Sequence, residues 1–136
     1  MKNPRFENMG RCKYVLIKEK EAVTMKLVYM AHCVRPEAGE SIAGNLASAK
    51  AWLKFLNERH RDEFVFIAPW ILGCELWDDS NPEERAYGFE MNQCVISRCD
   101  ELWMVGPRLS NGMLEERAVI EANGGSVTDF TGMSIA

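Results

Sequence analysis

The apolar positions of this chain alternate between short continuous runs and longer stretches with helical spacing. Continuous runs between chain breakers at residues 26–31, 64–68 and 102–105, and a shorter one near 127–130, are typical of buried strands. Between the first two runs, apolar residues recur every three or four positions, which predicts a helix over residues 41–58. Strands separated by helices in this way form a parallel sheet with right-handed crossovers.

The second half of the chain carries clear helix boundaries. Asn81 is a favoured N-cap residue, and Pro82 with the acidic pair after it suits a first helical turn, so a helix is predicted from residue 82 to about 98. A Gly/Ser/Asn-containing loop at residues 106–112 leads into another helix, predicted over residues 113–122. Each predicted strand is therefore followed by a loop at its carboxyl end.

These elements predict a single-domain α/β fold over residues 26–136, a three-layer Rossmann-like or flavodoxin-like parallel sheet flanked by helices. With 136 residues and 47% apolar content, the chain can bury one core. Residues 1–25 are mostly polar and are predicted to form an N-terminal arm or an added edge strand at residues 14–17. Neither GxGxxG nor GxxxxGK[ST] occurs, so the sequence lacks a dinucleotide fingerprint and a P-loop.

Composition narrows the class of function. A net charge of −4 argues against a partner that is a nucleic-acid polymer, because phosphate neutralisation needs a basic surface. Five cysteines without a CxxC pair and two histidines outside any cluster predict reduced thiols and no metal site. No apolar stretch reaches membrane length and no leader is recognised, so we expect a soluble, cytoplasmic protein that does not associate with membranes.

The predicted loops at residues 32–39, 69–79 and 106–112 share the carboxyl edge of the sheet, where open α/β folds bind ligands. Glu116 follows the third loop on a helix, which makes it a candidate catalytic carboxylate. The structural alternative is a solvated helix residue, and Glu115, about 100° away around an ideal helix, is its natural control. Small residues in the third loop let the backbone approach a ligand, although they also suit a simple turn.

Two motifs stand in order on these elements. The first strand contains Tyr29 and continues into a loop with Arg35, and the third loop has the spacing Ser110-x-Gly112-x-x-x-Glu116. Over roughly residues 26–130 this arrangement resembles the nucleoside 2-deoxyribosyltransferase superfamily, and its Ser is similar to the branch of deoxynucleoside 5′-monophosphate N-glycosidases. The resemblance implies that Glu116 is the nucleophile.

The same resemblance implies a binding site for the substrate and its 5′-phosphate, made by residues of the first and third loops: Tyr29, His32, Cys33, Arg35, Ser110, Asn111 and Gly112. Two positions depart from the family pattern. Cys33 stands where the family has Ser, and Asn92 stands where it has an Asp that assists proton transfer. Asp78 or Asp79 could supply the missing acid, and Trp70 or Trp77 could stack on a base, although core packing is the alternative for both rings.

The predicted function is hydrolysis or transfer at the N-glycosidic bond of a (deoxy)nucleoside 5′-monophosphate, through a glutamate nucleophile. Because this bond breaks through an oxocarbenium-like sugar, the chemistry needs carboxyl groups and no cofactor or metal. The resemblance also implies a homodimer or larger homo-oligomer. Two alternatives stay open: a nucleotide-binding or sequestering protein of the same fold without efficient catalysis, and an oligomerising scaffold with a vestigial pocket.

Overall fold

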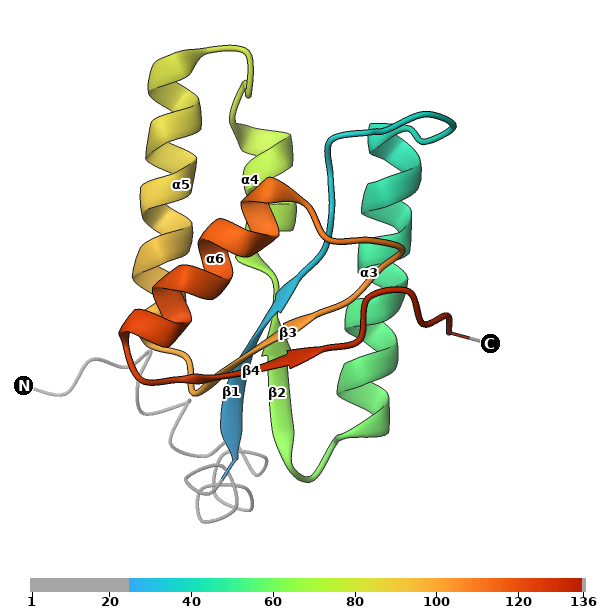
Figure 1. The fold of residues 1–136 in the computed structure, drawn as a ribbon, viewed down its shortest axis with the longest axis vertical. Coiled ribbons are helices and arrows are strands. Elements are labelled where there is room, and N and C mark those ends of the chain that lie inside the picture. The colour runs from blue at the N-terminus through green and yellow to red at the C-terminus, as the bar shows by residue number, and fades with distance from the viewer. Residues whose placement is uncertain (1–24, 136) are drawn as a thin grey trace, which may run out of the picture.

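The computed structural model describes residues 25–135 and consists of one four-stranded parallel sheet with helices on both faces (Figure 1). The strand order is β2-β1-β3-β4, with β1 at Lys26–Ala31, β2 at Phe64–Ile67, β3 at Glu101–Met104 and β4 at Ser126–Asp129. Every pair of neighbours is parallel, and Tyr29 of β1 lies opposite both Ile67 and Leu102. The predicted three-layer α/β fold is confirmed, and the predicted edge strand at residues 14–17 lies outside the described residues.

Four helices connect the strands. Helix α3 (Ile42–Arg59) links β1 to β2, α4 (Pro69–Leu76) and α5 (Pro82–Ile96) link β2 to β3, and α6 (Asn111–Ala122) links β3 to β4. The chain steps from β1 to β2 in one direction and then returns across the sheet to β3. With right-handed crossovers, this reversal places α3 on one face and the other three helices on the opposite face, as Figure 1 shows.

Side-chain caps set the starts of three helices. The Ser41 hydroxyl accepts from the Gly44 N–H at 2.9 Å, and the Asn81 side chain accepts from the Glu83 N–H at 3.0 Å. Such caps satisfy N–H groups that have no partner within the helix. The third cap is at α6, where the Ser110 hydroxyl accepts from the Met113 N–H at 3.3 Å.

One element prediction was wrong. Residues 69–79 were predicted as a loop, whereas residues 69–76 form the helix α4. Its apolar side chains lie on several sides, with Trp70 buried and Leu72 exposed, so the segment lacks a helical period. Pro69 at the first helical turn is the local signal that indicates a helix start here. The Trp70 indole N–H donates to the Met30 carbonyl at 2.7 Å, which ties α4 to the end of β1.

The core lies around the two central strands. Residues 28–31 of β1 are fully buried, and all four residues of β3 are buried, which is typical of parallel strands covered on both faces.

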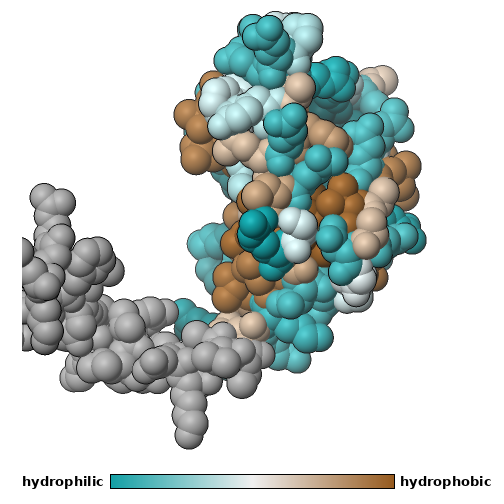
Figure 2. Space-filling model, turned by 90° about the vertical axis from the view of Figure 1, so that its left-hand side faces the viewer, coloured by the Kyte–Doolittle hydropathy of each residue, from teal (hydrophilic) through white to brown (hydrophobic). Residues whose placement is uncertain are grey.

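Helix α5 exposes several large apolar side chains, namely Tyr87, Phe89 and Met91. On the side of the molecule shown in Figure 2, apolar residues are interspersed with polar ones. No helix within residues 25–135 is long and apolar enough to span a bilayer.

A helix side chain occupies the outer edge of the sheet. Asn57 of α3 accepts a hydrogen bond from the Phe66 N–H at 2.9 Å and donates to the Phe66 carbonyl at 3.0 Å. The same amide also donates to the Leu53 carbonyl at 3.0 Å within its own helix. Since β2 has a strand neighbour on one side only, Asn57 satisfies the outward-facing peptide groups in the middle of this edge.

Candidate functional site

The sheet brings Tyr29 and Glu116 together. Tyr29 points from β1 into the layer that contains α6, where its hydroxyl faces the carboxyl group of Glu116. Tyr29 is fully buried, and its hydroxyl makes no hydrogen bond of ordinary geometry with any described residue. A buried hydroxyl without a partner is uncommon in folded proteins. The hydroxyl is therefore available to donate to an anion at this position.

Burial dominates the chemistry of Glu116. The side chain is partly buried, and loss of solvent raises the pKa of its carboxyl group to about 7. The Tyr29 hydroxyl lowers this pKa and the neighbouring Glu115 raises it, both by less than burial. Burial and Glu116 together raise the pKa of Tyr29 well above its usual value, so the phenol stays protonated at neutral pH. Glu115 itself is exposed, as expected for the adjacent helix position.

The first loop reaches the segment between α4 and α5 through Arg35. Its Nη2 and Nε donate to the same Asp79 carboxylate oxygen at 3.1 and 3.3 Å. Both side chains are more than half exposed, and Arg85 lies on the other oxygen of Asp79 at 3.9 Å. The guanidinium that was predicted to hold a phosphate is thus paired with a carboxylate that was predicted to be an acid.

Asp78 has a different environment. Its Oδ1 accepts from the hydroxyl and the backbone N–H of Ser80 at 2.6 and 2.9 Å. These hydrogen bonds lower the pKa of Asp78, which favours the ionised form at neutral pH. The contacts describe a turn-forming carboxylate rather than a proton donor.

The third loop places Ser110 at the N-cap of α6, followed by Asn111 and Gly112 in the first turn. Both of these residues are exposed, and their N–H groups precede the first hydrogen bonds within the helix. Such N–H groups suit an anion. Glu116 lies further along the same helix, so the predicted phosphate cradle and the predicted nucleophile share one rigid element.

His32 and Cys33 are buried, with exposed fractions of 3% and 0%. The His32 ring pairs through Nδ1 with the Cys33 carbonyl at 2.7 Å and through Nε2 with the Ser48 hydroxyl at 2.9 Å. Burial lowers the pKa of His32 and raises the pKa of the Cys33 thiol, so both groups are neutral at pH 7. The His32 ring leaves no room for a side chain at Gly106, because a Cβ there would lie 2.7 Å from Nε2. Both ring nitrogens of His32 are thus already engaged by groups of the protein itself.

The remaining predicted residues lie on the helices. Asn92 is partly buried on α5, which packs against α6. Trp70 packs in the core with its N–H used, while Trp77 packs edge-to-face on Tyr87 with ring centres 5.1 Å apart. The Trp77 ring N–H is buried and has no partner among the described residues.

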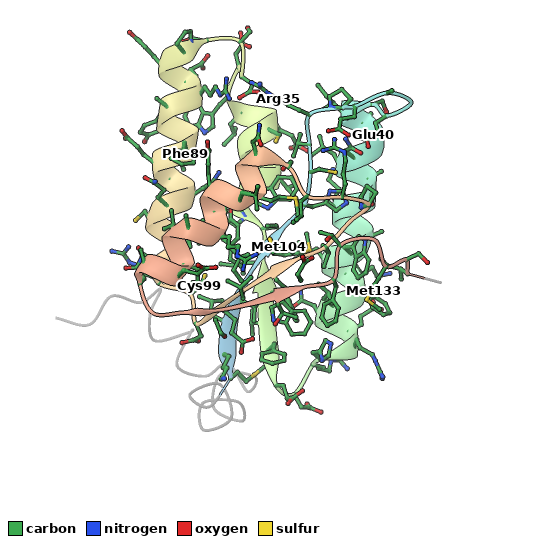
Figure 3. The ribbon with its side chains drawn as sticks, viewed as in Figure 1. Arg35, Glu40, Phe89, Cys99, Met104 and Met133 are labelled. Atoms are coloured by element: carbon green, nitrogen blue, oxygen red, sulfur yellow. The ribbon has the colours of Figure 1, made fainter. Side chains whose placement is uncertain are left out.

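Sequence reasoning missed Glu40, the centre of a network at this edge. The Arg108 guanidinium donates from Nε and Nη2 to the two Glu40 oxygens at 3.0 and 2.8 Å. These bonds, and a further one from Asn45, lower the pKa of the Glu40 carboxyl to about 2. Figure 3 shows Glu40 beside α3 and Arg35 toward α4. Because Glu40 and Arg108 are 68 residues apart in sequence, no local pattern indicates their pairing.

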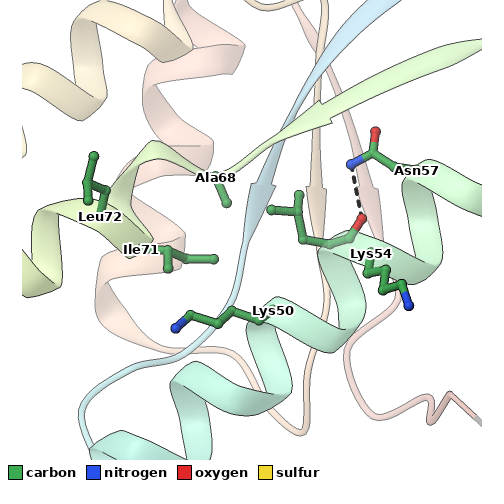
Figure 4. A pocket seen from close by; sticks show the side chains of 7 residues that line it. Lys50, Lys54, Asn57, Ala68, Ile71 and Leu72 are labelled. Carbon is green, nitrogen blue, oxygen red and sulfur yellow. Dashed lines mark hydrogen bonds between the residues drawn. The ribbon is translucent and has the colours of Figure 1, made fainter.

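A hollow on the surface lies away from these residues. It is lined by residues of α3 and the start of α4: Lys50, Leu53, Lys54, Asn57, Ala68, Ile71 and Leu72 (Figure 4). None of the predicted site residues lines it. Across residues 25–135, no group of three His, Cys, Asp or Glu side chains is placed to hold a metal ion, and the four cysteines are free thiols.

The parallel sheet and the loops gathered at its carboxyl edge define a three-layer α/β protein of the Rossmann-like class. The chain belongs to the family described as a domain of unknown function, DUF7768, which matches residues 26–130. No curated protein and no solved structure is similar enough to match the chain. The family match covers all the described strands and helices and every predicted site residue.

Proposed function

We propose that this protein cleaves or transfers at the N-glycosidic bond of a deoxynucleoside 5′-monophosphate, with Glu116 as the nucleophile. The observation that carries the proposal is the buried Tyr29 hydroxyl, which has no hydrogen-bond partner among the described residues and lies close enough to the Glu116 carboxyl to lower its pKa. A carboxyl group of raised pKa that faces a neutral phenol in a buried setting is typical of catalytic sites.

The chemistry follows from this pair. The ionised Glu116 carboxylate attacks the anomeric carbon as the bond to the base breaks, and the Tyr29 hydroxyl orients the attacking oxygen. The resulting glycosyl ester is then resolved by water or by a second base. The departing base takes its proton from solvent water. Below about pH 7 the protonated fraction of Glu116 grows, and protonated Glu116 cannot act as a nucleophile. The active form is therefore the ionised one.

Arg35 and the start of α6 would hold the phosphate. Arg35 is exposed and can exchange its carboxylate partner for a phosphate, because an exposed ion pair contributes only about 0–1 kcal/mol. The N–H groups of Asn111 and Gly112 would supply further donors. This arrangement supports a nucleotide over a nucleoside as substrate.

A second function is supported by a specific observation: the residues that were predicted to supply an acid are poorly suited to that role. Asn92 cannot transfer a proton, hydrogen bonds lower the pKa of Asp78, and Asp79 is paired with Arg35. A protein that binds a nucleotide and turns it over slowly fits these contacts, since general acid assistance is worth about a hundred- to ten-thousand-fold in rate.

The test is release of free base from a panel of deoxynucleoside and ribonucleoside 5′-monophosphates. We expect the parent protein and Glu115→Gln to release base and Glu116→Gln to lose the activity. An equal loss of base release in both variants would contradict the assignment of Glu116 as the nucleophile. Binding of a nucleotide without base release would favour the second function.

A further inference from the structure

We infer that Arg108 is a positioning residue for phosphate recognition: clamped by Glu40, it fixes the backbone from which Arg35 projects. The inference rests on the proposed function and assigns a role to a network that the catalytic pair does not use. It concerns affinity for the phosphate group and leaves the chemical step to Glu116.

Arg108 joins the third loop to the first. Besides its two bonds to Glu40, its Nη2 donates to the Arg35 carbonyl at 2.7 Å, and Glu37 lies 3.1 Å from Nε. The Arg108 side chain is only 20% exposed, although most of the residues that it contacts lie in a surface loop. Bidentate pairing of this kind fixes direction as well as distance.

Glu40 connects this clamp to the helix layer. Its Oε1 also accepts from the Asn45 side chain at 3.1 Å, and the same Asn45 amide donates to the Val34 carbonyl at 2.9 Å. Asn45 is buried, with 6% of its surface exposed, and belongs to the first turn of α3. The consecutive carbonyls of Val34 and Arg35 are thus both held, one from α3 and one from Arg108.

The charges around Arg108 exclude it as the first partner of a phosphate. Two carboxylates, Glu37 and Glu40, surround one guanidinium, so an incoming anion would meet net negative charge. Arg35 has one exposed partner, Asp79, which Arg85 also contacts, and it faces solvent. Arg35 is therefore the cation that can exchange its carboxylate partner for a phosphate, and Arg108 fixes the backbone position of Arg35.

The experiment measures affinity by titration calorimetry in the Glu116→Gln background, which separates binding from turnover. A deoxynucleoside 5′-monophosphate is compared with the deoxynucleoside of the same base. We expect Arg108→Ala to weaken monophosphate binding about tenfold while the nucleoside binds as before. Arg108→Lys keeps the charge but not the two-pronged contact, so we expect only partial recovery.

Two controls identify the route of the effect. With Arg35→Ala already present, Arg108→Ala should cause no further loss, because non-additivity marks residues that act together. Arg98→Ala removes the same charge near the amino end of β3 and should leave both affinities unchanged. Thermal unfolding and circular dichroism of each variant check that the fold is intact.

Three results would overturn the inference. Equal weakening of monophosphate and nucleoside would make Arg108 a general stability residue, and additive losses with Arg35→Ala would make it an independent phosphate contact. If the parent and the Glu116→Gln protein bind no monophosphate, the proposed function fails and the inference fails with it. Base release by the parent alongside either of the first two results would leave the proposed function standing.

Discussion

The hydroxyl of Tyr29 lowers the pKa of the Glu116 carboxyl while burial raises it by more, so the carboxyl titrates near neutrality. The two residues come from a central strand and from the helix that follows the neighbouring strand. Neither group has its ordinary acidity, since Glu116 in turn raises the pKa of Tyr29. The position of the Tyr29 ring on β1 thus contributes to the pH range in which Glu116 is ionised, while burial has the larger effect.

Tyr29→Phe should shift the pH dependence of base release upward. The parent rate is expected to rise with pH and level off above about 7, because only the ionised Glu116 attacks. Removing the hydroxyl removes the interaction that lowers this pKa, so the midpoint of kcat/KM against pH should move to higher pH. A midpoint that stays in place or falls would contradict the geometry of the pair.

Glu116→Gln should stabilise the ligand-free protein at pH 8. The folded-state pKa of Glu116 is about 7, against an ordinary value of 4.5 for a glutamate, so the unfolded state releases this proton first and stability falls as pH rises between these values. The maximum effect on the free energy of unfolding is roughly 3 kcal/mol, because a difference of one in pKa corresponds to about 1.4 kcal/mol. Urea denaturation at pH 4 and pH 8 measures it: the difference between variant and parent should be small at pH 4. Glu115→Gln is the control, and a pH-independent difference for Glu116→Gln would refute the burial argument.

Gly106→Ala should destabilise the fold far more than Gly39→Ala. Both glycines have positive φ, 99° and 84°, so both substitutions carry backbone strain of about 1–2 kcal/mol. Only at Gly106 would the new Cβ collide with the His32 ring, whereas nothing lies within 4 Å at Gly39. Chemical denaturation should show at least about 1 kcal/mol between the two variants. Similar losses would mean that the ring can move aside.

Asp79→Asn should tighten monophosphate binding by up to about fivefold, because the variant frees Arg35 from a competing anion worth at most about 1 kcal/mol. Glu83→Gln, nearby in the first turn of α5, removes the same charge without touching Arg35 and is the matched control. Titration calorimetry gives the affinity. A large fall in kcat with unchanged affinity would instead assign Asp79 the role of the acid.

The backbone of this fold was predictable because its signals are local. Buried strands appear as apolar runs, and Asn81 was predicted as an N-cap, which the structure confirms. The helix predicted to begin at residue 113 begins two residues earlier, at Asn111, with Ser110 as its cap. Helix α4 was missed because its apolar residues have no single face. Helix boundaries depend on residues that are neighbours in sequence, so they can be predicted without knowledge of the tertiary structure.

The site was predictable only where spacing along one element sufficed. Ser110 and Glu116 share α6, so six residues of sequence fix their relation. The Arg35–Asp79 pair and the Arg108–Glu40 clamp join residues 44 and 68 positions apart, and their partners depend on how the loops meet across the sheet edge. The burial that raises the pKa of Glu116 is likewise a property of the packed layers.

The amide of Asn57 also governs how this sheet can meet another chain. An exposed edge strand ordinarily offers a ladder of free N–H and C=O groups to any extended segment, and proteins protect such edges against aggregation. Here the pair of groups at Phe66 is already engaged by a side chain from α3. A strand from another molecule would have to displace the Asn57 amide before it could form hydrogen bonds with the middle of β2. Self-association through a continuous sheet is therefore disfavoured at the β2 edge.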